Sequence, residues 1–327
     1  MSSVEQELYH IFSYYTLHGN PLDPEHLRAT QFVKLARDCQ IVGTTPVTEA
    51  DLNVSYTAEV KRKNRVGIKR MTYADFLTVL MKLSTKVYPD SVNVDDSFQR
   101  LLMENVLPLA SRRCPDAVDM FLEDEDVAGL FSYYADAMLA IFQYYASQGD
   151  IKAKARARPS PRAKGSNTMK DALGYQEFLK FAADFNLSSS VILSTLELGD
   201  IFLSSIKPTA GEHTIRKLTF REFREALVRC ALVAYSKISE ASIIDKIRGL
   251  FLYMWRSINK SIPKAFDHRR NLSTYHGDLL SGAMLFNKRF TAQWAADGYR
   301  DYLSPAGAEE ESGTEVLSRL LLRTDGD

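Results

Sequence analysis

The residues whose types and spacing come nearest to a metal site begin at Asp51. A calcium-binding EF-hand loop needs oxygen ligands at its positions 1, 3 and 5, a glycine at position 6 and a bidentate glutamate at position 12. Asp51, Asn53 and Ser55 could supply the first three ligands. Tyr56 and Arg62 then stand where the glycine and the glutamate are required. Because a cation at the bidentate position repels the ion, we expect no calcium binding by this stretch.

A zinc site is the second possibility that the side chains raise. His18, His26 and Cys39 are close together in the sequence. A closed zinc site has four protein ligands, so this set is one ligand short. We interpret the three residues as a turn histidine, a surface histidine and a buried cysteine, and we expect no metal and no cofactor.

No motif for enzymatic chemistry is present. The sequence lacks Gly-x-Ser-x-Gly, a phosphate-binding glycine loop and a dinucleotide fingerprint. Its 16 glycines are scattered singly, and its six histidines do not cluster with acidic residues. We therefore predict a protein that is not an enzyme and has no catalytic residues.

A basic segment is the sharpest functional feature of the sequence. Prolines and a glycine interrupt this segment, and residues 151–170 contain no acidic residue. We predict a flexible loop over 151–168 that attracts polyanions through salt-sensitive contacts. Nucleic acid is one such partner and tubulin, with its acidic surface and tails, is another. The loop has no aromatic residues for base stacking, which argues against nucleic acid. A merely solubilising surface loop is the alternative. The six cations are Lys152, Lys154, Arg156, Arg158, Arg162 and Lys164.

The chain contains three segments that occur twice in the same order. This pattern indicates a tandem duplication and favours two related binding surfaces over one catalytic cleft. The matching pairs are 11–20 with 141–150, 32–41 with 178–187, and 68–76 with 215–223.

The repeated segments follow helical periodicity, with apolar residues such as Phe76, Leu80 and Leu83 on one face. Thr72 with Asp75 forms a predicted capping box, and so do Thr219 and Glu222 in the second copy. A short extended piece precedes each box. The predicted fold is all-α, with two tandem degenerate EF-hand-like helical modules, short β-bridges and an extended C-terminal arm. Helices are expected near 4–18, 27–38, 72–88 and 94–110, and near 136–148, 172–185, 219–236 and 241–259.

Charge and composition suggest where the modules end. Residues 96–150 have 3 basic and 10 acidic residues, whereas residues 151–265 have 20 basic and 10 acidic ones. We predict a first module with its trailing helix at 1–110, an acidic bridge at 111–129, a second module at 130–262 and an arm at 263–327. Three cysteines suit a reducing compartment. No signal peptide is visible, and the most apolar stretch is too short and too polar to span a membrane.

The C-terminal arm is rich in aromatic residues, which is unusual for a disordered tail. We expect it to become ordered against a partner. Folding back onto the two modules is the alternative. The predicted anchors are Phe286, Phe290, Trp294 and Tyr299.

The stretch from Phe12 to Lys86 resembles the tubulin polymerisation-promoting protein family. The resemblance implies a helical, EF-hand-like core without functional calcium loops, which binds and bundles microtubules and has relatives in ciliated and flagellated cells. Animal members have a His/Cys zinc cluster, but Ala36 stands where one of its cysteines would be. The matching residues are Phe12, His18, Gly19, Phe32, Lys34, Leu35, Arg37, Asp38, Cys39, Thr48, Asp51, Ile68 and Thr72 to Phe76.

Together these features predict a non-enzymatic, microtubule-binding structural protein of the cytoplasm and cytoskeleton. A ciliary or flagellar axoneme is the expected location, with the lumen of a doublet microtubule as one site within it. Its partners would be tubulin and neighbouring axonemal proteins, without nucleic acid or membrane. The alternative is an EF-hand-like, calcium-responsive or scaffolding regulator of soluble partners.

Overall fold

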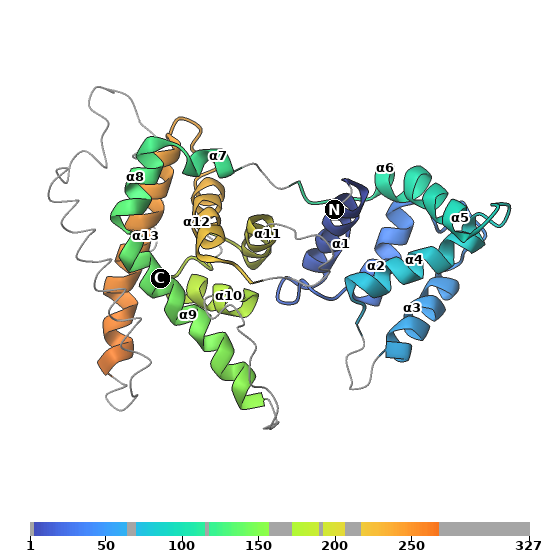
Figure 1. The fold of residues 1–327 in the computed structure, drawn as a ribbon, viewed down its shortest axis with the longest axis horizontal. Coiled ribbons are helices and arrows are strands. Elements are labelled where there is room, and N and C mark those ends of the chain that lie inside the picture. The colour runs from blue at the N-terminus through green and yellow to red at the C-terminus, as the bar shows by residue number, and fades with distance from the viewer. Residues whose placement is uncertain are drawn as a thin grey trace, which may run out of the picture. The chain divides into compact units, whose positions relative to one another are not determined.

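The computed structural model describes residues 3–63, 70–114, 118–156, 172–189, 192–206 and 217–267 (Figure 1). In these ranges the chain consists of helices joined by loops and isolated β-bridges, without a sheet, which confirms the all-α prediction. The chain divides into two compact units, of which unit 1 ends at Pro115 and unit 2 begins at Asp116. None of the helices in the described ranges has the length and apolar character needed to cross a membrane.

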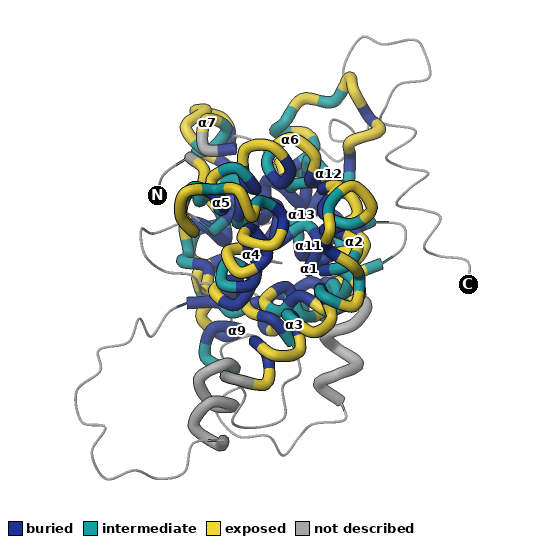
Figure 2. The backbone as a smooth tube through the Cα atoms, turned by 90° about the vertical axis from the view of Figure 1, so that its right-hand side faces the viewer, coloured by how far each residue is buried: buried dark blue, intermediate teal, exposed yellow. Residues whose placement is uncertain are grey.

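Unit 1 is built around aromatic side chains from its first four helices. Phe12, Phe32 and Phe76 are at most 2% exposed. The rings of Phe12 and Phe76 lie 5.5 Å apart and tie the first helix to the fourth. Figure 2 shows exposed and buried stretches alternating along these helices, as expected for amphipathic segments. The four helices are α1 (Ser3–Gly19), α2 (Ala29–Asp38), α3 (Glu49–Lys63) and α4 (Tyr73–Val87).

A two-residue antiparallel bridge joins the two helix–loop–helix pairs of unit 1. The backbone N–H of Leu27 donates to the carbonyl of Met71 at 2.8 Å, and the N–H of Met71 donates back at 3.1 Å. Leu27 precedes α2 and Met71 precedes α4, so the loop between α1 and α2 is paired with the loop between α3 and α4. The predicted β-bridge of the first module is therefore present.

A continuous helical stretch follows α4 and packs against it. It consists of α5 (Val94–Arg100), the π-helical segment η1 (Leu101–Val106) and α6 (Leu107–Leu109). The π segment lies just before Pro108, which has no N–H to contribute to the helix. Asn105 in η1 donates to the backbone carbonyl of Cys39 at 3.0 Å, which fastens this stretch to the end of α2.

Unit 2 has the same order of helices, with two short helices added in front. Its bridge joins Leu173 to Leu218, with both N–H···O distances at 2.8 Å. Asn186 at the end of its second main helix donates to the hydroxyl of Tyr253 at 2.8 Å. The helices are α7 (Asp119–Leu122), α8 (Glu125–Tyr133), α9 (Ala135–Arg156), α10 (Tyr175–Asp184), α11 (Thr195–Ser205), α12 (Phe220–Ala234) and α13 (Ile243–Asp267).

Several contacts occur at matching positions in the two units. The hydroxyl of Tyr15 donates to Asp38 at 2.6 Å, and that of Tyr145 donates to Asp184 at 2.9 Å. In unit 2 the rings of Phe142 and Phe223 have their centroids 5.6 Å apart, and this pair corresponds to the Phe12–Phe76 pair of unit 1. These contacts join the same helices in each unit.

The helix ends also match. Gln40 and Asn186 both adopt left-handed backbone, with φ of 55° and 56°, just after α2 and α10. The two predicted capping boxes, at Thr72 and Thr219, are confirmed. Ser194 begins α11 with a further capping box, which the sequence analysis did not identify.

Three sequence expectations need correction. Residues 51–62, which were compared with an EF-hand loop, lie within α3, because Leu52, Tyr56 and Val60 form a buried stripe at helical spacing. The basic loop does not begin at 151, because α9 runs to Arg156: its alternating alanines and cations favour helix until the first proline. The last helix continues past Pro263 to Asp267.

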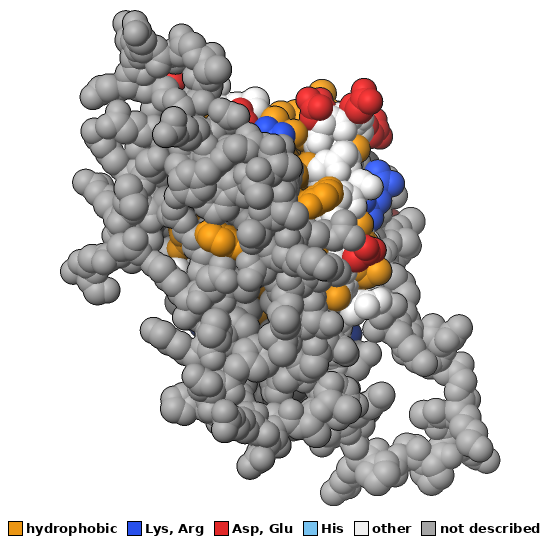
Figure 3. All heavy atoms as spheres, turned by 90° about the vertical axis from the view of Figure 1, so that its left-hand side faces the viewer, with side chains coloured by type: hydrophobic (Ala, Val, Ile, Leu, Met, Phe, Trp, Pro, Cys, Tyr) orange, Lys and Arg blue, Asp and Glu red, His pale blue; other side chains and the backbone are white. Residues whose placement is uncertain are grey.

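The segment at 111–129, predicted as an acidic bridge, contains α7 and the beginning of α8. Asp124 caps α8 by accepting hydrogen bonds from two backbone N–H groups, both at 3.1 Å. Acidic side chains are favourable in the first turn of a helix, where they face its positive end. On the face drawn in Figure 3, the visible described side chains mix apolar, acidic and basic types rather than forming a patch of one sign.

Candidate partner-binding surface

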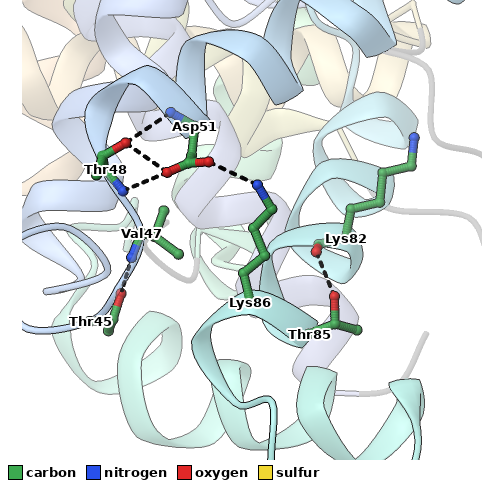
Figure 4. A network of polar contacts seen from close by, with 7 residues as sticks. All are labelled: Thr45, Val47, Thr48, Asp51, Lys82, Thr85 and Lys86. Atoms are coloured by element: carbon green, nitrogen blue, oxygen red, sulfur yellow. Dashed lines mark hydrogen bonds and ion pairs between the residues drawn. The ribbon is translucent and has the colours of Figure 1, made fainter.

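A polar network lies where α3 begins (Figure 4). Asp51 accepts hydrogen bonds from the backbone N–H and the hydroxyl of Thr48, at 3.1 and 2.6 Å. Its other carboxylate oxygen accepts from Lys86 of α4 at 2.9 Å. The bonds from Thr48, followed by the bond from Lys86, hold the pKa of Asp51 well below its usual value. The carboxylate therefore stays ionised and links α3 to α4.

A second ion pair joins the same two helices. The Nζ atom of Lys82 lies 2.6 Å from Oε2 of Glu59. The Glu59 side chain is fully buried, whereas that of Lys82 is 54% exposed. Lys86 is 53% exposed and its partner Asp51 is 35% exposed. In both pairs the acid is more deeply buried than the cation.

These lysines belong to an outward surface of α4, which we call the α4 face. Its members are one helical turn apart or adjacent, and all are exposed. Met81 adds an apolar side chain that is 39% exposed. The α4 face consists of Met81, Lys82, Thr85 and Lys86.

A separate polar cluster ties the two loops of unit 1 together beside the bridge. Asp23 accepts a hydrogen bond from His26 at 2.8 Å and another from Arg70, which follows α3. Partial burial alone would raise the pKa of Asp23, but the bonds from His26 and Arg70 outweigh it and lower that pKa. The cluster is internally satisfied, so we interpret it as a structural link between the loops.

Comparison with protein-family models assigns unit 1 to a known domain family. A family model described as p25-alpha matches residues 9–119, which cover unit 1 from α1 through α6. Residues 9–119 form a p25-alpha domain. This is the domain of the tubulin polymerisation-promoting protein family, so the predicted resemblance is confirmed for this part of the chain. A search of curated proteins found no match to the chain.

The p25-alpha family is linked in general with binding to tubulin and microtubules. The p25-alpha domain here carries the α4 face, the Asp23 cluster and the bridge between the two loops. Unit 2 has matching contacts, but the family model does not extend over it.

The predicted partner-binding residues lie outside the p25-alpha domain. Lys152, Lys154 and Arg156 are in the last turns of α9, where positions 152 and 156 are one helical turn apart. Arg158, Arg162 and Lys164 lie outside the described residues. The same holds for the aromatic residues of the arm, Phe286, Phe290, Trp294 and Tyr299.

The possible zinc ligands of the p25-alpha domain are used in other contacts. Nδ1 of His18 is 2.8 Å from the backbone carbonyl of Tyr14, and Nδ1 of His26 is bonded to Asp23. Burial raises the pKa of the Cys39 thiol to about 12, which disfavours the thiolate that binds zinc. Among the residues that the structure describes, no group of three or more His, Cys, Asp or Glu side chains is placed to hold a metal ion.

Sequence analysis did not identify the α4 face. Lys82 and Lys86 are single cations within an apolar pattern, and a pair of lysines at that spacing is ordinary on a solvated helix. The lysine that donates to Asp51 is 35 residues away in the sequence. The helical spacing of the two lysines was visible in the sequence, but their partners on α3 were not.

Proposed function

We propose that this chain is a non-enzymatic structural protein that binds microtubules, as a component of a ciliary or flagellar axoneme. The p25-alpha domain at residues 9–119 is the observation that carries this proposal, because the family is linked with tubulin. The lumen of a doublet microtubule is one location that such a component could occupy.

We further propose that unit 2 is a second, divergent copy of the same fold. The support is the set of matching contacts: the two bridges, the two Tyr–Asp hydrogen bonds and the two pairs of phenylalanine rings. Two copies in one chain would give a lattice-bound protein two related surfaces. Different backbone paths of α1–α4 and α9–α12 on superposition would contradict the duplication.

The test of the function uses the full chain. Tagged protein expressed in a ciliated or flagellated cell should remain with axonemes after extraction with detergent and salt. Purified full-length protein should also pellet with microtubules made from pure tubulin. Complete release from axonemes, with no pelleting at low salt, would contradict the proposal. Calcium should not change the pelleting, whereas the calcium-responsive alternative requires that it does.

The basic segment of unit 2 is expected to carry part of the affinity for tubulin. Six cations occur over 13 residues without an acidic residue between them, and tubulin is acidic. Replacing Lys152, Lys154, Arg156, Arg158, Arg162 and Lys164 with glutamine should weaken microtubule pelleting, most strongly at low salt. Glutamine keeps good helix propensity, so α9 should persist. Unchanged pelleting at every salt concentration would assign the segment to another role.

The aromatic arm is expected to anchor the chain within its assembly. Exposed rings are unfavourable by roughly 25 cal/mol per Å² of apolar surface, and docking on a partner would recover that term. We expect residues 265–305 to be cleaved by protease in the free protein and protected in the axoneme. Equal protease resistance of the arm and the two units in the purified monomer would favour the alternative, in which the arm packs onto its own chain.

A further inference from the structure

The α4 face directs its positive charges outward. Lys82 and Lys86 are 54% and 53% exposed, whereas the carboxylates that contact them lie deeper. Each ion pair is therefore oriented, with its positive end toward solvent. A carboxylate that approaches from solvent meets the ammonium groups before it meets Glu59 or Asp51. Its attraction to the nearer lysines then exceeds its repulsion from the more distant carboxylates, because the Coulomb energy falls with distance.

Unit 2 shows whether the fold needs these lysines, because it has different residues at the two positions that align with Lys82 and Lys86. Val233 occupies the position of Lys86, and Arg229 occupies that of Lys82. The Arg229 side chain is only 10% exposed, since it turns inward to Ser205 and Glu225. Unit 2 nevertheless keeps the bridge, the Tyr–Asp bond and the capping box at the beginning of α12. Outward cations at these positions are therefore not needed to build this helical framework.

A purely structural role explains Lys86 less well than a binding role does. Its ion pair with Asp51 is exposed at both ends and contributes little to stability, because solvent screens it and the long lysine side chain loses freedom. Thr48 already bonds Asp51 twice without Lys86. Met81 and Val54, 39% and 68% exposed, place apolar side chains on the same two helices. Cations interspersed with exposed apolar side chains are suited to an acidic protein surface.

We propose that the α4 face of the p25-alpha domain contacts tubulin, with Lys82 and Lys86 pairing to carboxylates on the microtubule. This inference rests on the proposed function and identifies the surface that performs it. Charge complementarity selects the partner, because tubulin is acidic and the α4 face presents cations. The same positions in unit 2 lack outward cations, so the two units would contribute differently to binding.

The test compares full-length variants in microtubule pelleting at several salt concentrations. Lys86→Val installs the residue that unit 2 has at this position and should weaken binding roughly two- to fivefold. Adding Thr85→Glu reverses the local charge while leaving Lys82 on Glu59, and should weaken binding on the order of tenfold at low salt. Thr85 is exposed, and glutamate favours helix, so the fold should be kept. Circular dichroism and thermal melting check that it is.

Lys180→Val is the matched control. Lys180 is an exposed lysine of unit 2 that pairs with Asp184, much as Lys86 pairs with Asp51. It should leave pelleting unchanged. Equal binding by the unchanged chain and the Thr85→Glu/Lys86→Val variant would overturn this inference alone. No binding by the unchanged chain would overturn the proposed function and this inference with it.

The same comparison on microtubules whose acidic tails have been removed by limited proteolysis separates two sources of carboxylates. A difference between variant and unchanged chain that persists places the contact on the tubulin body. A difference that disappears places it on the tails. Either result supports the α4 face as the binding surface.

Discussion

Replacing Phe76 with alanine is expected to destabilise unit 1 by about 3–5 kcal/mol, the usual cost of removing a fully buried phenylalanine ring. Phe76 is 0% exposed and its ring lies 5.5 Å from that of Phe12 and 6.3 Å from that of Tyr73. These neighbours come from α1 and α4, so the cavity would lie where the two helices meet. Because whole domains are stable by only about 5–15 kcal/mol, this loss would bring unit 1 close to unfolding.

Urea denaturation followed by circular dichroism should show the effect as an earlier transition for part of the signal. Limited proteolysis with mass spectrometry then identifies the unit that unfolds. The earliest cleavage sites should lie in unit 1, on the N-terminal side of Pro115. Met81→Ala is the control on the same helix, because Met81 is 39% exposed and should cost far less. A loss below about 1 kcal/mol for Phe76→Ala would contradict the central position of this ring in the core.

The aligned variant in unit 2 extends the comparison. Phe223 is 1% exposed, and its ring is 5.6 Å from that of Phe142. Phe223→Ala should destabilise unit 2 by a similar amount, with early cleavage after Asp116. Loss of both units together in either variant would show that they unfold as one cooperative body rather than as two.

Features fixed by local chemistry could be predicted from the sequence. Thr72 and Asp75 are three residues apart, so their capping box depends on almost nothing outside α4. The bridge at Met71 was predicted because a short extended piece precedes each capped helix. Repetition of the same segments supported both predictions, since a pattern that occurs twice is less often accidental.

Helix α3 was misread because two patterns coincide in it. Asp51, Asn53 and Ser55 have the alternate spacing of calcium ligands, while Leu52 and Tyr56 have the spacing of a helix. The ligand pattern uses polar side chains, which a helix also exposes to solvent. The apolar stripe decides the structure, because burying it stabilises the fold whereas an incomplete ligand set contributes nothing.

The basic segment shows how a composition argument can misplace a boundary. Clustered cations and nearby prolines indicated a loop from 151 onward. Lysine, arginine and alanine are good helix formers, however, and salt screens the repulsion between neighbouring like charges. Helix α9 therefore continues through Lys152 and Lys154 and ends at Arg156.

The α4 face could not be predicted, since its character depends on which partner of each ion pair is buried. Lys82 and Arg229 occupy aligned positions, yet one is 54% exposed and the other 10%. The difference follows from the residue that faces each cation on the neighbouring helix. Lys82 faces Glu59 of α3, whereas Arg229 faces Ser205 of α11. A buried acid on α3 satisfies an outer lysine, whereas in unit 2 the arginine turns inward and meets an acid of its own helix.

That inward arginine lies at a buried polar junction in unit 2. Nη1 of Arg229 donates to the hydroxyl of Ser205 at 3.1 Å and lies 3.9 Å from Oε2 of Glu225. Glu225 is 1% exposed, and Arg221 approaches its other oxygen at 3.5 Å. Removing one partner of a buried ion pair is costly, because the charge that remains is still out of water.

Arg229→Met is therefore expected to destabilise unit 2 by about 3–5 kcal/mol, although methionine fills much of the same volume. The double variant Glu225→Leu/Arg229→Met removes both charges and should recover most of that loss, since apolar replacement of a buried pair is often nearly neutral. As a contrast in unit 1, Lys86→Met breaks an exposed pair and should cost less than about 1 kcal/mol. Urea denaturation of the unchanged chain, Glu225→Leu, Arg229→Met and the double variant gives the coupling energy between Glu225 and Arg229. A double variant no more stable than Arg229→Met would show that the arginine stabilises unit 2 through packing and its bond to Ser205, and not through the charge of Glu225.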